Sequence, residues 1–150
     1  MEKLRLHDWL TLTANLAVIG SIVFLGIELR QNNSLLRQEA ENVYFNNRVV
    51  LSEALMQDGG LAAIYVKVTR GEELDDVEAL RIDRYYRRLY RGFEWEYLQS
   101  REGLLDLRQN DQWATMINEN EYSRDVWRWF AESVAEQSFV EFVNEILLKQ

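Results

Sequence analysis

The chain has 150 residues, 47% of them hydrophobic, and a formal net charge of −8. This length and composition suit a folded domain with a core, and the acidic balance argues against nucleic acid as a partner. There is no cysteine, which excludes disulfides and thiolate chemistry, and the absence of proline favours helices over a turn-rich β fold.

The first predicted element is an apolar helix at the N-terminus. Trp9 to Ile27 are 19 consecutive uncharged residues, ten of them Leu, Ile, Val or Phe. As a helix they rise roughly 28 Å, close to the thickness of about 30 Å of a hydrocarbon core. We therefore predict that residues 1–30 are an N-terminal membrane anchor that crosses the lipid bilayer once. A cleaved signal peptide and a buried helix of a soluble protein are the alternatives.

Four residues of this anchor are candidates for helix packing in the membrane. Thr13, Ala17 and Ser21 recur every four residues, and small residues at this spacing let two helices approach closely in lipid. Asn15 lies on a different face and needs a polar partner in hydrocarbon, such as another helix or Thr11 one turn away. These residues predict a homo-oligomer. The alternatives are that small residues are common in membrane helices, or that Asn15 and Thr11 line an oligomeric pore.

The helix is expected to continue past the membrane, because no helix breaker precedes Gly59. Residues 31–150 are accordingly predicted to form a helical stalk and an acidic helical body. Apolar residues seven positions apart, with small or polar residues between them, form a heptad seam typical of a coiled coil. The seam residues of the stalk are Leu36, Val43, Asn47 and Val50. The alternative is that this face packs against later helices of the same chain.

A compact bundle of about four to five shorter helices is predicted after Gly59, so the fold class is all-α. Acidic residues at 72–78 are typical of a helix start, and the apolar spacing that follows indicates a core face. Further helices are expected at 111–118, from about Ser123 through Val134, and over the last residues of the chain. The core face of the helix after 78 consists of Ala79, Ile82, Tyr86, Leu89 and Phe93.

A polar cluster is the candidate for a ligand-binding or enzymatic site in the body. It consists of Glu94, Glu96, Arg101 and Arg124. Glu96 borders the core face, where an ionised carboxylate needs partners, and we expect Arg101 or Arg124 to supply them. A structural ion-pair cluster is the favoured interpretation. The chain has a single histidine, His7, so no catalytic residue, metal site or cofactor is predicted.

A basic face is predicted on the helix that starts near residue 78. Its members are Arg81, Arg84, Arg88 and Arg91. The favoured interpretation is that these arginines pair with acidic residues at 72–78 or 132–145 of the same chain. Anionic lipid headgroups are the functional alternative.

The stretch WLTLTANLAVIGSIVFLGIELRQNN, followed by RGFEWEYLQSREGLL and a later RDVW, resembles a large group of uncharacterised bacterial proteins with one amino-terminal membrane helix and a helical body. Phe93-Glu94 stands where that group usually has a tryptophan and a glutamate, and Tyr122-Ser123 replaces its proline-glycine turn. Because the group has no established activity, the resemblance implies an architecture and not a function.

These observations predict a membrane-anchored, non-catalytic interaction or scaffold protein that self-associates. The resemblance implies a single-pass protein of the bacterial inner (cytoplasmic) membrane. Arg30, Arg37 and Arg48 outnumber Lys3 and Arg5, which favours a cytoplasmic body. No protein partner is identified by the residues.

Overall fold

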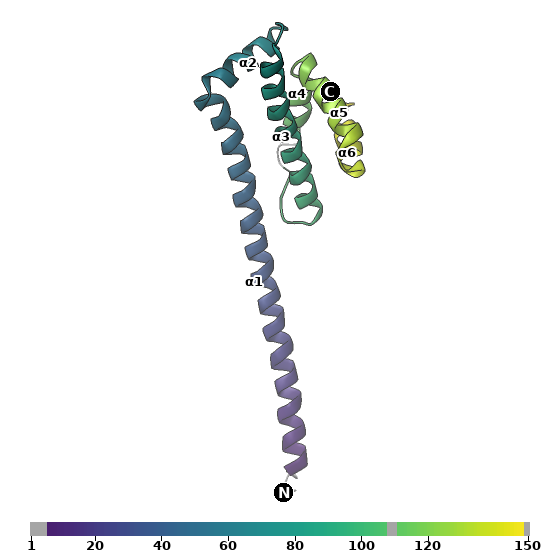
Figure 1. The fold of residues 1–150 in the computed structure, drawn as a ribbon. Helices are drawn as coiled ribbons and strands as arrows, with labels where there is room; N and C mark the ends of the chain where they lie inside the picture. The colour runs from purple at the N-terminus through teal and green to yellow at the C-terminus, as the bar shows by residue number, and fades with distance from the viewer. Residues whose placement is uncertain (1–5, 108–110, 149–150) are drawn as a thin grey trace. The chain divides into compact units, whose positions relative to one another are not determined.

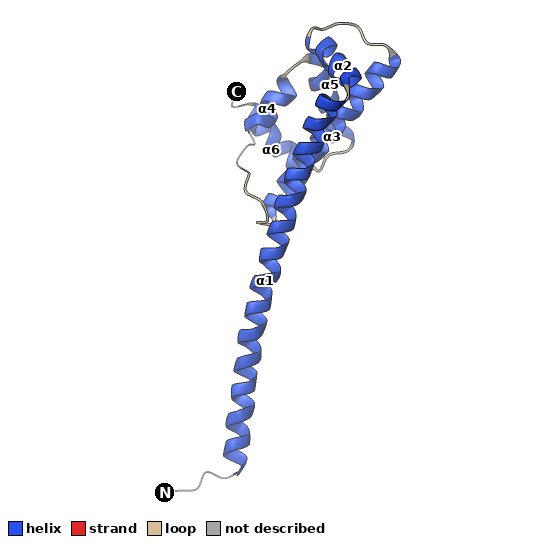
Figure 2. Cartoon of the chain, turned by 90° about the vertical axis from the view of Figure 1, so that its left-hand side faces the viewer, coloured by secondary structure: helices blue, strands red, loops and turns tan. Residues whose placement is uncertain are grey.

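The computed structural model describes residues 6–107 and 111–148, which form six helices and no strand (Figure 1). The helices are α1 (Leu6–Gln57), α2 (Gly59–Thr69), α3 (Asp76–Arg101), α4 (Asp111–Asn118), α5 (Glu121–Ser133) and α6 (Gln137–Leu147). Figure 2 shows the same elements coloured by secondary structure. The all-α fold, with one long N-terminal helix followed by five shorter helices, confirms the prediction.

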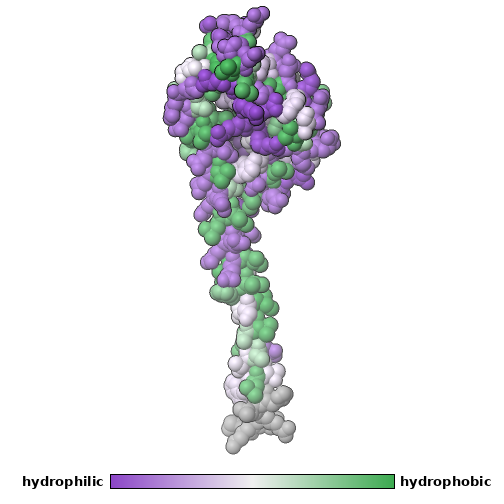
Figure 3. Space-filling model, in the orientation of Figure 1, coloured by the Kyte–Doolittle hydropathy of each residue, from purple (hydrophilic) through white to green (hydrophobic). Residues whose placement is uncertain are grey.

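The chain divides into two compact units, Met1–Glu39 and Ala40–Gln150. In the first unit every residue from Asp8 to Glu39 is exposed. By its length and apolar composition α1 is able to cross a membrane. In Figure 3 hydrophobic side chains cover much of the visible face of this stretch. Lys3 and Arg5, which the orientation argument counts, lie outside the described residues.

The core of the second unit is organised around α3, which contacts α2, α5 and α6. Of the five residues of the predicted core face, Ile82, Tyr86, Leu89 and Phe93 are buried, and Ala79 is only half-buried. Burial of such side chains contributes about 1.5–3 kcal/mol each. The axis of the bundle is therefore the helix whose sequence has the clearest amphipathic pattern.

Side-chain caps and two glycines set the helix boundaries around α2 and α3. Asp58 is the cap between α1 and α2, and its Oδ1 accepts hydrogen bonds from the backbone of Gly60 at 3.0 Å and Leu61 at 3.2 Å. Asp75 and Glu78 form a reciprocal capping box at the start of α3. Gly71 and Gly103, at φ +68° and +72°, turn the chain after α2 and α3 in a conformation that side chains with a Cβ disfavour.

Helices α4, α5 and α6 complete the bundle through aromatic contacts. The Trp113 ring of α4 stacks on Phe93 of α3 at 5.1 Å, and Trp127 of α5 meets Phe139 of α6 edge-on at 5.8 Å. Such ring pairs stabilise a fold beyond the area they bury. One expectation is wrong: α5 ends at Ser133, and Val134 is its exposed C-cap because its backbone leaves the helical region at φ −136°.

Candidate functional site

Two glutamates of α3 are buried in the second unit. Glu94 and Glu96 are 4% and 5% exposed, so each carboxylate needs charged or hydrogen-bonding partners. They lie between Phe93 and Tyr97, which belong to the core. The helical pattern that buries those aromatic residues also places the two glutamates at the border of the core.

Glu96 pairs with Arg48 of α1 through two hydrogen bonds. Arg48 Nη2 donates to Oε2 at 3.1 Å, and Arg48 Nε donates to Oε1 at 3.3 Å. The guanidinium also lies over the Tyr44 and Phe93 rings, at 5.3 Å and 5.9 Å from their centroids. This paired, stacked geometry suits arginine better than lysine.

Burial raises the pKa of Glu96 above its usual value, and the charge and hydrogen bonds of Arg48 oppose this shift. The nearby Trp113 indole also lowers the pKa of Glu96. The buried indole N–H of Trp113 makes no hydrogen bond of normal geometry within the described chain. The desolvation of the carboxylate is therefore only partly offset. Keeping the Glu96 carboxylate ionised in the folded protein therefore costs free energy, and its contacts are those of a structural residue.

Glu94 joins α3 to the start of α6. Its Oε2 pairs with Arg91, and its Oε1 accepts a 2.6 Å hydrogen bond from the backbone N–H of Glu136. The Glu136 side chain in turn accepts a hydrogen bond of 2.6 Å from Ser138, whose hydroxyl accepts one from Arg101 at 2.8 Å. Glu94 and Arg101 thus contact neighbouring residues at the start of α6, the N-cap Glu136 and Ser138 of its first turn.

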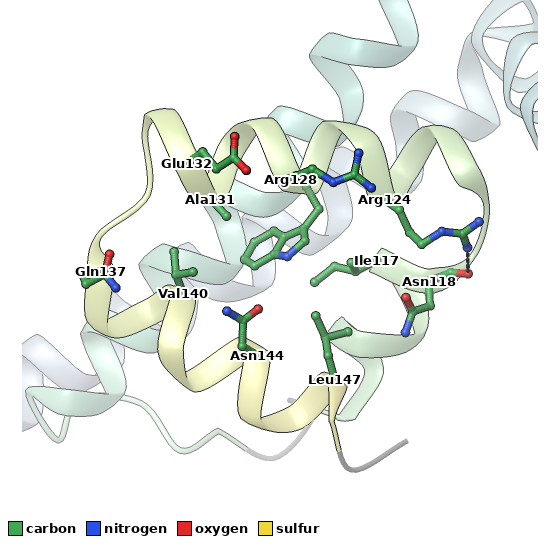
Figure 4. A pocket seen from close by; sticks show the side chains of 11 residues that line it. Ile117, Asn118, Arg124, Arg128, Ala131, Glu132, Gln137, Val140, Asn144 and Leu147 are labelled. Atoms are coloured by element: carbon green, nitrogen blue, oxygen red, sulfur yellow. Dashed lines mark hydrogen bonds between the residues drawn. The ribbon is translucent and has the colours of Figure 1, made fainter.

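The predicted partners of Glu96 are wrong. The sequence suggests Arg101 or Arg124, whereas in the described chain Arg48 is the cation that pairs with it, from 48 positions earlier. Arg124 instead donates to the backbone carbonyl of Asn118 at 3.1 Å (Figure 4). The periodicity of α3 identifies Glu96 as a buried acid, but no local pattern marks Arg48.

The carboxylates of Glu94 and Glu96 are occupied by these partners. Neither residue lines the pocket between α5 and α6 or the groove between α1 and α3. No group of three or more His, Cys, Asp or Glu side chains gathers closely enough to hold a metal ion in the described chain. The arrangement holds α1, α3 and α6 together.

The four arginines of the basic face are all exposed on α3, but their surroundings differ. Arg81 pairs with Asp58 of the α2 cap, and Arg91 pairs with Glu94. Neither acid comes from the predicted segments 72–78 and 132–145. Arg84 and Arg88 have no ion pair among the described residues, and Arg88 borders a groove of about 310 Å³ with Asn47, Leu51 and Trp95.

The seam residues of α1 are placed in two groups. Asn47 is half-buried beside the groove, and its neighbours Ala40 and Leu51 are buried within the second unit. Leu36, Val43 and Val50 are 41%, 37% and 39% exposed. Leu36, Val43 and Val50 are therefore uncovered in the single chain, whereas Asn47 is partly covered by the chain's own bundle.

The membrane-packing candidates are all exposed on α1. Thr13 Oγ1 donates to the Trp9 carbonyl and Ser21 Oγ to the Ala17 carbonyl, each at 2.8 Å, so both hydroxyls are satisfied inside their own helix. The Asn15 amide has no partner among the described residues. Of these side chains, Asn15 is the one with unused donors and acceptors.

The chain matches no family model, and neither curated proteins nor solved structures show significant similarity to it. The resemblance to the bacterial group therefore rests on the quoted motifs alone.

Proposed function

We propose that the protein is a membrane-anchored, non-catalytic interaction protein that self-associates through α1. The observation that carries this proposal is the exposure of α1: each residue of its uncharged stretch, residues 9–27, lacks cover from the chain's own helices. An apolar surface of this length is stable in lipid and not in water. In this proposal the lipid bilayer surrounds the apolar surface of residues 9–27.

Self-association is supported by the polar and apolar residues that α1 leaves uncovered. The Asn15 amide has no partner among the residues described, and in hydrocarbon such a group gains from a hydrogen bond to a second helix. Leu36, Val43 and Val50 repeat every seven positions and are exposed. A second α1 would cover both features. The hydroxyls of Thr13 and Ser21 donate to carbonyls of their own helix, so a second helix is able to approach this face without leaving those donors unpaired.

The non-catalytic part of the proposal is supported by the state of the buried acids. Glu94 and Glu96 each bond to cations or backbone donors of the chain. A general acid or base needs access to its substrate within hydrogen-bond reach, and neither group lines the pocket or groove described above. Their role in this proposal is to hold helices together.

Two measurements test the proposal. Alkaline carbonate extraction is expected to leave the protein in the membrane pellet, and release into the soluble fraction would contradict the anchor. Mass measurement of the intact assembly in detergent is expected to give more than one chain. A strict monomer at all protein concentrations would contradict self-association while leaving the anchor standing.

A matched pair of variants locates the contact. Changing Leu36, Val43 and Val50 to Ser together with Asn15→Leu is expected to shift the assembly toward monomer. The control changes the exposed apolar residues Leu35, Phe45 and Met56 to Ser, which lie off the heptad line. If both variants dissociate equally, the seam is not the contact.

A further inference from the structure

The strongest unassigned feature is a pocket of about 560 Å³ in the second unit, between α5 and α6. Figure 4 shows the α5 side chains on one side, the α6 side chains on the other, and Ile117 and Asn118 of α4 at one end. Its volume lies in the range of small-molecule sites, roughly 300–1,000 Å³. Because α4 limits the pocket at one end, it suits a short ligand better than a long partner helix.

The pocket has an apolar floor from three helices. The floor residues are Ile117, Trp127, Ala131, Val140 and Leu147. The Trp127 ring is held by edge contacts with Tyr90 at 5.5 Å and Phe139 at 5.8 Å, so this wall is fixed before any ligand arrives. Its indole N–H has no hydrogen-bond partner among the described residues. A floor of this kind binds an apolar group with little reorganisation.

Two arginines of α5 lie toward one end of that floor (Figure 4). Arg124 is oriented by its bond to the Asn118 carbonyl, which uses one of its N–H donors. Arg128 follows one turn later and bonds Asp125 at 3.2 Å, but both side chains are mostly exposed, so the pair is weak. The Asn144 amide faces the middle of the pocket from α6, between Val140 and Leu147, and has no partner in the described chain (Figure 4).

The acidic group of the pocket lies at its other end. Glu132 is eight residues after Arg124 on α5, which corresponds to about 12 Å along a helix. An anion is therefore attracted to the Arg124 end and repelled from the Glu132 end. This polarity selects the orientation of an elongated ligand as well as its charge.

We propose that this pocket binds a small organic carboxylate with an apolar body. The carboxylate bonds the guanidinium groups of Arg124 and Arg128, the apolar body covers the floor beside Trp127, and the Asn144 amide binds a polar atom of the ligand. The site is independent of membrane anchoring and of self-association, since all of its residues belong to the α4–α6 part of the second unit.

The test uses the full chain in phosphatidylcholine nanodiscs, with phenylbutyrate as the probe and empty nanodiscs as the blank. Saturable binding is measured by isothermal titration and by ligand-observed NMR. Phenylbutylamine, which has the same apolar body and the opposite charge, is expected not to bind. Absence of saturable phenylbutyrate binding, or equal binding of the amine, would overturn the proposal.

Two variants and one control test whether the probe binds in this pocket. The double change Arg124→Gln and Arg128→Gln is expected to weaken binding at least about tenfold, because two charge-assisted bonds are lost. Asn144→Phe fills the pocket from an exposed position and is expected to abolish binding. The matched control Arg84→Gln with Arg88→Gln removes the same charge from α3 and is expected to change affinity less than about twofold. Unchanged affinity in the first two variants, or an equal loss in the control, would overturn the assignment.

Discussion

Arg48 of α1 and Glu96 of α3 form a two-bond ion pair, with Nη2 3.1 Å from Oε2, inside the second unit. The Glu96 side chain is 7% exposed and the Arg48 side chain 23%, so the acid is the more desolvated partner. The loss of the cation is therefore more costly than the loss of the whole pair.

Arg48→Met is expected to destabilise the second unit by up to about 3 kcal/mol at neutral pH, because it leaves a buried carboxylate unpaired. Denaturant unfolding followed by circular dichroism measures the change. The destabilisation should shrink at mildly acidic pH, where Glu96 takes up a proton. Adding Glu96→Gln should recover most of the loss, and a double variant as unstable as Arg48→Met alone would show that packing dominates.

The buried tyrosines of α3 predict a loss of stability in alkali. Burial raises the pKa of Tyr86 from 10.0 to about 12, and burial also raises the pKa of Tyr90. The folded state therefore keeps phenol protons that the unfolded state releases, so the free energy of unfolding falls as pH rises from about 10 to 12. Melting temperatures across this interval, compared with Tyr86→Phe, check the sign. The variant should show a shallower decline.

Two glycines in helices should respond differently to alanine. A Cβ at Gly92 of α3 meets nothing within 4 Å, whereas one at Gly60 of α2 comes within 3.0 Å of Arg81 Nη1 and 3.1 Å of Asp58 Oδ1. Gly92→Ala is expected to stabilise the unit by roughly 0.5–1 kcal/mol. Gly60→Ala should give no gain, since it displaces the guanidinium that pairs with the α2 cap. Thermal melts compare the two, and equal stabilisation would show that Arg81 moves aside at no cost.

Neighbouring arginines of α3 should differ in their contribution to stability. Arg87 Nε lies 2.7 Å from Asp83 Oδ2, and its guanidinium stacks 3.5 Å from the centroid of the Trp129 ring. Arg87→Gln is expected to cost about 1 kcal/mol. Arg84→Gln, at an exposed position without an ion pair in the described chain, should stay within about 0.5 kcal/mol. Chemical unfolding of both variants measures the difference, and equal costs would show that neither the ion pair nor the stack of Arg87 contributes to stability.

Local pattern predicts the helices of this chain well. Period and capping signals are properties of neighbouring residues, so α3, with Ile82, Tyr86, Leu89 and Phe93 on one face and acids in its first turn, is evident from sequence. The end of α5 is less evident. Val134 continues the apolar spacing, but the chain turns toward α6 at that residue.

Contacts between helices are not determined by such patterns. A helical period shows which face of α3 is buried but not which residue of α1 lies opposite, because that depends on how the two helices dock. Arg48 thus became the partner of Glu96 through the packing of α1 on α3, whereas Arg124 bonds the Asn118 carbonyl across the short connection between α4 and α5. The pocket beside Trp127 has the same origin, since it forms where α5 and α6 stand apart over α4.

The sequence by itself determined the all-α class, the apolar N-terminal stretch, the amphipathic face of α3 and the burial of Glu96, because each follows from the order of neighbouring residues. Only the tertiary structure decided which cations neutralise the buried acids, which arginines of α3 stay unpaired, and where a pocket opens. The Arg48–Glu96 pair and the pocket depend on residues of different helices, whose side chains meet only when the helices pack, whereas the Arg91–Glu94 pair lies within α3.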